Sequence, residues 1–220
     1  MIRYAANLSL LFTEWPFDDR FDAACDAGFE AVEFSFPLGS SAINVVENLR
    51  RTGLRQVLAS VPLRPGGKGL AAIAGQATES KDDFLLGLEY AVAGGSPLLH
   101  VLSGVVDLAS YEVSCEVFEE RMSWAIEQAA RLNVKLVIEA INRISVPNYF
   151  IRSLTDTVQW TQRLDGLGLI LDLHHASMEE LDPLECIRLH LPRADHLQIA
   201  SFPGMHEPDM DSLCMQGVVD

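Results

Sequence analysis

The sequence predicts an α/β fold, a barrel of the (β/α)8 type. Apolar runs alternate with amphipathic helical segments along most of the 220 residues, and such alternation is typical of parallel βαβ units. Several predicted strands end in polar side chains, and barrels of this kind build their active sites at the carboxyl ends of the strands. The seven strand-like runs suit a closed barrel better than a short open sheet.

Each predicted strand is a short run of aliphatic and β-branched residues bounded by polar or turn-forming residues. Such runs are typical of strands buried on both faces of a sheet. The seven strands span Tyr4 to Leu8, Ala31 to Phe34, Leu54 to Val61, Leu98 to Leu102, Lys135 to Glu139, Gly168 to Asp172 and His196 to Ile199.

Helices are predicted between the strands from apolar residues that recur at helical spacing. The first spans Phe17 to Ala27, with Phe17, Phe21 and Cys25 on one side, and stops at Gly28. The others span Ile43 to Arg51, Ser80 to Ala93, about Tyr111 to Leu132, Leu154 to Leu164 and Pro183 to His190.

The loops carry no nucleotide-binding motif. The first strand is not followed by a glycine-rich turn, and Gly66 to Gly69 lacks the spacing of a P-loop. We therefore predict that Gly66 to Gly69 belongs to a mobile loop after the third strand.

The charge balance disfavours two classes of partner. The chain has 16 basic and 31 acidic residues, a net charge of −15, which opposes binding to nucleic acid and to anionic membranes. No apolar run is long enough to span a bilayer. We expect a small-molecule substrate, with no nucleic acid and no membrane as partner.

The chain is predicted to be one domain, residues 1–220, because neither a linker nor an internal repeat is visible. The four cysteines lie far apart, which argues against a metal cluster or a disulfide framework. The first residues make a poor signal peptide. We therefore expect a cytoplasmic protein.

The last residues are atypical of a barrel. Residues 210–220 contain little apolar sequence, too little for a final helix and at best enough for a weak strand. We expect the eighth βα unit to be missing or degenerate. Exposed edge strands favour association with other chains, so a homo-oligomer remains one of the expected partners.

Three successive strands end in an oxygen-bearing side chain. Glu139 follows the apolar run Leu136 to Ile138, Asp172 ends the next strand, and Gln198 lies in the last. A charge at the end of a buried strand is costly unless a metal, a substrate or a partner compensates it. These oxygens suit Mg²⁺ or Mn²⁺, with Zn²⁺ and Co²⁺ as alternatives. The competing interpretation is that the carboxylates cap loops or form salt bridges.

Other polar residues are candidates for substrate contact. In strict alternation His196 and Gln198 face the same way, and Glu33 needs a partner if it points inward. Arg143 could hold a substrate carboxylate by a bidentate contact, or form a salt bridge with an acidic loop. The predicted substrate-binding residues are Asn7, His100, Arg143, His175 and His206.

Several of these residues lie in segments that resemble one family, the hydroxypyruvate isomerases of the xylose isomerase-like TIM-barrel superfamily. Individually the segments are weak signals, but together they spread over nearly the whole chain. They are Tyr4 to Glu14, Ala27 to Phe34, Leu99 to Val101, Ile138 to Arg143, His196 to Ala200 and Pro203 to Asp209.

The resemblance implies a metal-assisted isomerisation of the aldose–ketose type, from hydroxypyruvate to tartronate semialdehyde through an enediolate. Glu139 matches a glutamate that is both a metal ligand and a proton donor and acceptor in the family. Asp172 and Gln198 match further metal ligands. A divalent metal in such an enzyme polarises the substrate oxygens, while carboxylates move the carbon-bound proton.

The chain departs from the family pattern at three places. Pro62 to Gly67 stands where the family has Gly-Asp-Trp, and Met205 stands where it has arginine. The family's glutamate on strand eight, its fourth metal ligand and second acid/base, has no counterpart before Asp220.

These departures keep several alternatives open. A 2-oxo-tetronate isomerase and a ketose 3-epimerase would use the same barrel, and a catalytically impaired barrel would only bind a ligand or partner subunits. A DNA-repair endonuclease of the related branch is a further alternative, which the net charge of −15 opposes.

Overall fold

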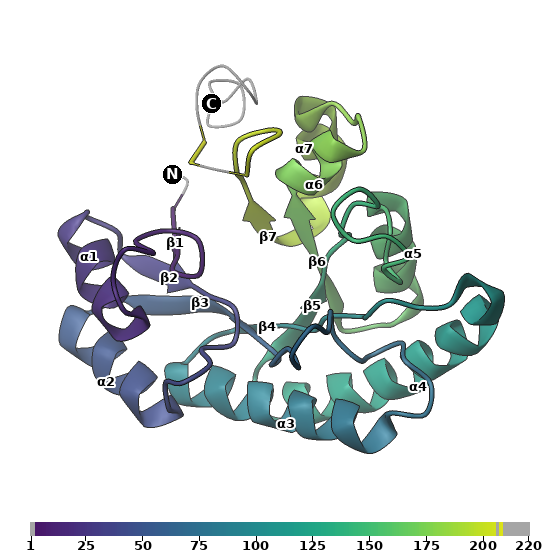
Figure 1. The fold of residues 1–220 in the computed structure, drawn as a ribbon, viewed down its shortest axis with the longest axis horizontal. Helices are drawn as coiled ribbons and strands as arrows, with labels where there is room; N and C mark the ends of the chain where they lie inside the picture. The colour runs from purple at the N-terminus through teal and green to yellow at the C-terminus, as the bar shows by residue number, and fades with distance from the viewer. Residues whose placement is uncertain (1–2, 206, 209–220) are drawn as a thin grey trace.

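The computed structural model describes residues 3–205 and 207–208. Its centre is one parallel sheet of seven strands in chain order. The sheet curls, with the helices on its outer side, and β1 and β7 face each other across the opening at the top of Figure 1. The strands are β1 (Ala6–Asn7), β2 (Ala31–Glu33), β3 (Arg55–Ser60), β4 (Leu98–His100), β5 (Lys135–Ile138), β6 (Leu167–Asp172) and β7 (Ala194–Gln198).

Local sequence signals fix where the helices begin and end. The Ser41 hydroxyl accepts from Asn44 N–H at the start of α2, Ser153 does the same for Asp156 N–H in α5, and Gly53 ends α2 at a φ of 72°. The α-helices are α1 (Arg20–Asp26), α2 (Ala42–Thr52), α3 (Ala77–Gly94), α4 (Tyr111–Ala130), α5 (Leu154–Arg163), α6 (Leu173–Met178) and α7 (Pro183–His190). Short 3-10 turns are η1 (Phe17–Asp19), η2 (Leu108–Ser110) and η3 (Leu191–Arg193).

The predicted order of strands and helices is confirmed, with shifts of a few residues at the ends. The first strand is shorter than predicted, and the first turn of the first helix is the 3-10 turn η1. The sequence analysis missed α6, because six residues are too few to reveal a helical period. Residues 209–220, which include the whole segment 210–220 predicted to be atypical, lie outside the described residues.

Alternation along the strands divides the core into an outer and an inner part. In β5, Leu136 and Ile138 pack in the large cluster beneath the helices, whereas Val137 packs inside the barrel with Leu58 and Ile170. Two residues after Val137 and Ile170, on the same face, come Glu139 and Asp172. The interior is therefore apolar in the middle and polar at the carboxyl ends of the strands.

The glycine-rich loop after β3 packs against the loop after β4. Gly69 forms an antiparallel bridge with Ser103, and its φ of 99° suits glycine. A Cβ atom at Gly69 would lie 2.1 Å from the carbonyl oxygen of Leu102. Gly69 therefore permits the close approach of the two loops, and the mobility predicted for the loop after β3 stays a prediction.

In the part of the chain that the structure describes, every helix is too short or too polar to cross a membrane. The described cysteines Cys25, Cys115 and Cys186 are free thiols. The cytoplasmic location stays a prediction.

The apolar centre of the barrel makes a testable contribution to stability. Ile170 is 1% exposed, so we expect Ile170→Ala to lower the free energy of unfolding by about 2–5 kcal/mol through lost burial and a cavity. Ile43→Ala is the matched control, because Ile43 is 70% exposed and should change stability by less than about 0.5 kcal/mol. Urea denaturation measures both variants, and equal losses would contradict this account of the core.

Candidate active site

The three strand-end residues predicted from the sequence lie at one edge of the sheet. Glu139 directly follows β5, and Asp172 and Gln198 are the last residues of β6 and β7. Asp172 and Gln198 are partners in the register of these strands, so their side chains leave the sheet on the same face, about 5 Å apart at the backbone.

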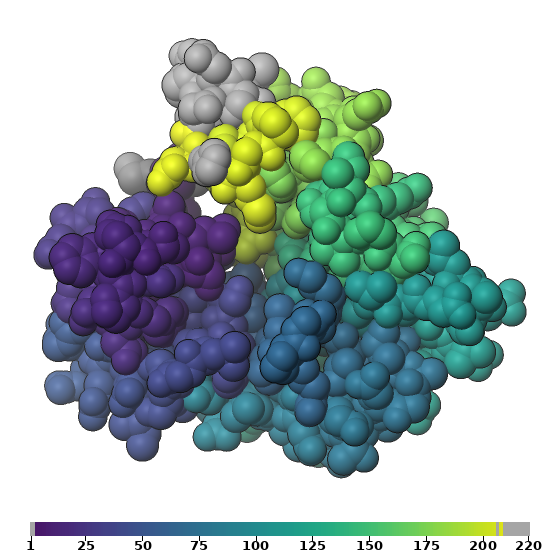
Figure 2. Space-filling view, viewed as in Figure 1, coloured from purple at the N-terminus to yellow at the C-terminus, as the bar shows by residue number. Residues whose placement is uncertain are grey.

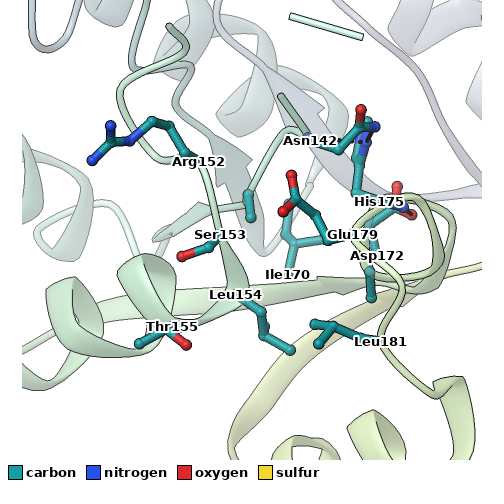
Figure 3. A pocket seen from close by; sticks show the side chains of 12 residues that line it. Asn142, Arg152, Ser153, Leu154, Thr155, Ile170, Asp172, His175, Glu179 and Leu181 are labelled. Atoms are coloured by element: carbon teal, nitrogen blue, oxygen red, sulfur yellow. Dashed lines mark hydrogen bonds between the residues drawn. The ribbon is translucent and has the colours of Figure 1, made fainter. Parts of the chain in front are cut away.

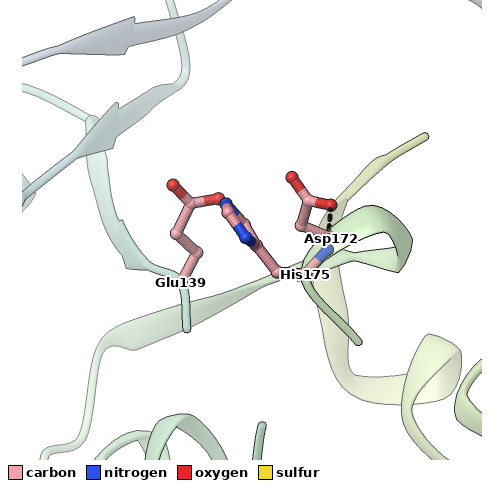
Figure 4. Close-up of side chains that lie close together, drawn as sticks. All are labelled: Glu139, Asp172 and His175. Atoms are coloured by element: carbon pink, nitrogen blue, oxygen red, sulfur yellow. Dashed lines mark hydrogen bonds between the residues drawn. The ribbon is translucent and has the colours of Figure 1, made fainter. Parts of the chain in front are cut away.

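A histidine side chain lies close to the Glu139 and Asp172 carboxylates. One potential ligand atom from each of Glu139, Asp172 and His175 lies within 4.8 Å of the others, and Figure 4 shows the Glu139 carboxylate beside the His175 ring. Helix α6 places His175 there, because Asp172 caps this helix and accepts a hydrogen bond of 3.1 Å from the His175 N–H.

Asn142 determines which nitrogen of the neutral His175 ring carries the proton. The Asn142 Oδ1 accepts from the N–H groups of Ile144 and Ser145, so its Nδ2 is the end that lies 2.7 Å from His175 Nδ1. The backbone N–H of Asn142 also points to Nδ1, at 3.5 Å. Nδ1 is therefore an acceptor, and the neutral ring carries its proton on Nε2.

His175 is consequently better placed to donate a hydrogen bond from Nε2 than to bind a metal. Burial lowers the pKa of His175, the charge of Asp172 opposes that shift and His174 adds to it. The ring is therefore held in its neutral form more strongly than an exposed histidine.

Glu139 is a buried carboxylate without a hydrogen-bond donor among the described residues. The nearest side-chain nitrogen that could pair with it is His100 Nε2, at 3.7 Å. Burial lowers the pKa of His100 to about 4, so this ring is neutral at pH 7. Burial, and then the charges of Asp172 and Glu33, raise the pKa of Glu139. The charge of Glu139 is thus left uncompensated by these neighbours.

Glu33 is the opposite case. Its Oε1 accepts hydrogen bonds from Asn7 Nδ2 at 2.9 Å and from Gln198 Nε2 at 2.7 Å, and its Oε2 pairs with His196 Nε2. Burial by itself raises the pKa of Glu33, but His196, Gln198 and Asn7 together lower it below the usual value. Glu33 is therefore a stable anion. His196 and Gln198 both reach Glu33, which confirms that they face the same way.

The donor set fits a divalent cation. Two carboxylates converge, and the Gln198 Oε1 makes no hydrogen bond with any described residue, since only the Nε2 end of this amide is bound. Carboxylate and amide oxygens are hard ligands that suit Mg²⁺ or Mn²⁺, whereas Zn²⁺ more often takes nitrogen or sulfur. The tautomer of His175 favours the same two ions, because its Nε2 offers a proton and not a lone pair.

A cavity of about 130 Å³ adjoins this group on the side of the loops that follow β5 and β6 (Figure 3). Asn142, Asp172 and His175 belong to its wall, together with Glu179 from the end of α6. The remaining lining residues are Ala140, Arg152, Ser153, Leu154, Thr155, Ile170, Ala176 and Leu181.

The other residues predicted to bind substrate are spread more widely. Asn7 lies inside the barrel but donates its amide hydrogen to Glu33. Arg143 is 63% exposed and its Nε lies 4.0 Å from Glu179 Oε2, which is the salt-bridge alternative. His206 lies outside the described residues.

Sequence reasoning missed two residues that shape the site, Asn142 and Glu179. Asn142 orients His175, and Glu179 accepts a hydrogen bond from the Arg143 N–H as well as facing its side chain. The signal for Asn142 was its position just after a strand-end carboxylate, where asparagine often forms a turn with the next residues. Nothing in the sequence pattern indicates Glu179.

Comparisons with known proteins identify relatives of the whole chain. A model of xylose isomerase-like TIM barrels matches residues 21–220. The 2-oxo-tetronate isomerase of Haemophilus influenzae is 34% identical, over 100% of this chain and 88% of its own. The hydroxypyruvate isomerase of Escherichia coli is 30% identical, over 94% of this chain and 83% of its own.

Solved structures agree on the fold. A crystal structure from Brucella melitensis, described as an AP endonuclease of family 2, has a TM-score of 0.94 and 34% identity over 100% of this chain and 87% of that chain. The D-psicose 3-epimerase of Clostridium cellulolyticum has a TM-score of 0.75 and 17% identity, over 93% of this chain and 76% of its own. The epimerase therefore shares the fold.

The uncompensated charge of Glu139 predicts a pH-dependent cost in stability. A carboxyl whose pKa is raised on folding stabilises the protein below its unfolded pKa of about 4.3, and loses that contribution as pH rises through the folded value. In protein freed of metal by a chelator, we expect Glu139→Gln to raise Tm at pH 8, by ~2–4 °C for each kcal/mol relieved. The gain should shrink as pH approaches about 4.3.

Calorimetry or circular dichroism at several pH values measures this effect. Glu89→Gln is the matched control, because Glu89 is exposed on α3 and its loss should leave Tm nearly unchanged. A Glu139→Gln protein that is less stable than the wild type at pH 8 would contradict the electrostatic description of the site.

Proposed function

The chain belongs to the xylose isomerase-like TIM barrel family, and on that basis we propose that it is a metal-dependent isomerase of short 3-hydroxy-2-oxo acids. The observation that carries the proposal is the buried Glu139 carboxylate next to Asp172, within reach of His175 and without a donor from the described residues. A site that leaves a buried anion uncompensated is suited to a cation and to proton transfer.

The first candidate substrate is hydroxypyruvate, which the reaction converts to tartronate semialdehyde. A second candidate is 2-oxo-tetronate, because relatives with that name are 33–34% identical to this chain, somewhat more than the hydroxypyruvate isomerase of Escherichia coli at 30%. Both substrates carry a hydroxyl next to a 2-oxo group, so one mechanism serves both.

We assign the carbon-bound proton to Glu139. Its carboxylate takes the proton from the carbon that bears the hydroxyl, and a proton returns to the neighbouring carbon, which bore the carbonyl. The hydroxyl proton passes to the former carbonyl oxygen. No atom is gained or lost, and the product is an isomer of the substrate.

We assign metal binding to Glu139, Asp172 and Gln198. A bound Mg²⁺ or Mn²⁺ supplies a Lewis acid that polarises the carbonyl and hydroxyl oxygens of the substrate. Two of these side chains are carboxylates, so one cation balances charges that are costly to bury together.

We assign substrate contacts to His175 and His100, whose rings lie beside the carboxylates. His175 donates from Nε2 to a substrate oxygen, with Asn142 holding the ring in place. Asn7, Arg143 and His206 are further candidates from the sequence. For Arg143, binding a substrate carboxylate would require exchange of its contact with Glu179.

The name of the Brucella melitensis relative raises a nuclease as the competing function. The net charge of −15 disfavours it, because DNA binding depends on basic residues that neutralise phosphates. A titration with fluorescent abasic DNA at low salt should give no binding. Tight binding that weakens steeply with salt would favour the nuclease.

The isomerase proposal is tested with purified protein, Mn²⁺ or Mg²⁺, and each of the two substrates. We expect turnover of at least one, abolished by a chelator and restored by the metal. Replacing the proposed base, in Glu139→Gln, should lower kcat by about 10²- to 10⁴-fold, and Asp172→Asn should raise the metal concentration required.

Glu127→Gln is the control for these variants, because Glu127 is an exposed residue of α4, and its activity should equal that of the wild type. The ratio of kcat/KM for the two acids decides the substrate. Absence of turnover with both acids and both metals would refute the proposal.

A further inference from the structure

Glu33 links two sides of the barrel that are far apart in the sequence. It lies on β2, yet both of its oxygens bind β7, through Gln198 Nε2 at 2.7 Å and through His196 Nε2. Asn7 on β1 donates to the same oxygen as Gln198, at 2.9 Å. Glu33 is 5% exposed, so water competes little for these contacts.

The contact with Glu33 decides which way the Gln198 amide points. The two ends of a side-chain amide have almost the same shape, and only hydrogen bonds distinguish the donor nitrogen from the acceptor oxygen. The carboxylate of Glu33 accepts only, so it selects the nitrogen. The oxygen Oε1 is left at the other end of the amide, where no described residue binds it.

That oxygen belongs to the residue paired with Asp172 in the register of β6 and β7. A cation held by Glu139 and Asp172 is attracted by an amide oxygen and repelled by an amide NH₂. The orientation of Gln198 therefore matters for the cation more than its mere presence on the strand.

We propose that Glu33 is a positioning residue, which holds the NH₂ group of Gln198 and thereby presents the Gln198 carbonyl oxygen to the divalent cation. The inference rests on the proposed metal-dependent function. Asn7 and His196 hold the Glu33 carboxylate in turn, so each of its oxygens has a fixed partner. Partners of metal ligands act in this way in many metal sites.

The test measures Mn²⁺ binding to metal-free protein by the electron paramagnetic resonance signal of free Mn²⁺, without substrate. Glu33→Met keeps the length of the side chain but removes the carboxylate. We expect Glu33→Met and Gln198→Ala each to weaken Mn²⁺ binding by about 10- to 100-fold. Both substitutions act through the same ligand atom, Gln198 Oε1. The double variant should therefore bind Mn²⁺ as tightly as whichever single variant has the lower affinity.

Glu33→Gln is the conservative variant. Its carbonyl can still accept from Asn7 and Gln198 while its NH₂ group donates to a neutral His196, so its Mn²⁺ affinity should lie nearer the wild type than that of Glu33→Met. Should Glu33→Met fail to fold, Glu33→Ala, which also removes the carboxylate, replaces it in the double-variant comparison. The variant Glu33→Ala/Gln198→Ala should then bind Mn²⁺ no more weakly than Gln198→Ala alone.

Asp195→Ala controls for general damage to β7. Asp195 binds Lys135 Nζ at 2.6 Å and the Leu169 N–H at 3.1 Å, and it alternates with His196 on the strand. We expect this variant to lower Tm and to leave the affinity for Mn²⁺ unchanged.

Two results would overturn the inference while leaving the metal site intact: wild-type affinity in Glu33→Met, or a double variant whose loss is the product of the two single losses. A wild-type protein that binds no Mn²⁺ would overturn both the inference and the proposed metal site. Protein that shows the coupling but isomerises neither acid would refute the proposed reaction alone.

Discussion

Unequal compensation of buried carboxylates is the constraint on which the interior of this barrel depends. Glu33 and Glu139 are both buried on the inner side of the sheet. Glu33 receives donors on both oxygens, and its pKa is lowered; Glu139 receives none from the described residues, and its pKa is raised. The protein's own side chains thus stabilise the Glu33 anion, whereas the Glu139 anion is left for a bound group to stabilise. Such a difference is typical of functional sites.

The Glu33 carboxylate also connects distant parts of the fold. Among the described residues β1 and β7 do not pair, and Figure 2 shows a hollow between the purple N-terminal elements and the yellow residues after β7. Glu33 crosses this region by binding His196 and Gln198. The contacts that orient Gln198 are therefore among those that connect the two ends of the sheet, so stability and the proposed metal site share them.

The sequence was informative wherever a single strand contains both the apolar run that predicts it and the polar residue of the site. In β5 the apolar run ending in Glu139 predicted the strand, its burial and the carboxylate at its end, and β6 did the same for Asp172. The prediction was incomplete where the chemistry depends on contacts between distant segments. The pattern showed that an inward Glu33 needs a partner, but not that its partners lie on β1 and β7. The short α6, which brings His175 to Asp172, and the turn through which Asn142 orients that ring also depend on tertiary contacts.

The central claim is that Glu139, Asp172 and Gln198 hold one divalent cation through oxygen atoms, while His175 remains a hydrogen-bond donor. Anomalous diffraction from crystals soaked in Mn²⁺ tests it most directly. We predict one strong peak between the two carboxylates, with Gln198 Oε1 among its ligands and His175 Nε2 outside coordination distance. A peak bound by His175 Nε2 with Gln198 turned away, or no peak between Glu139 and Asp172, would contradict the claim.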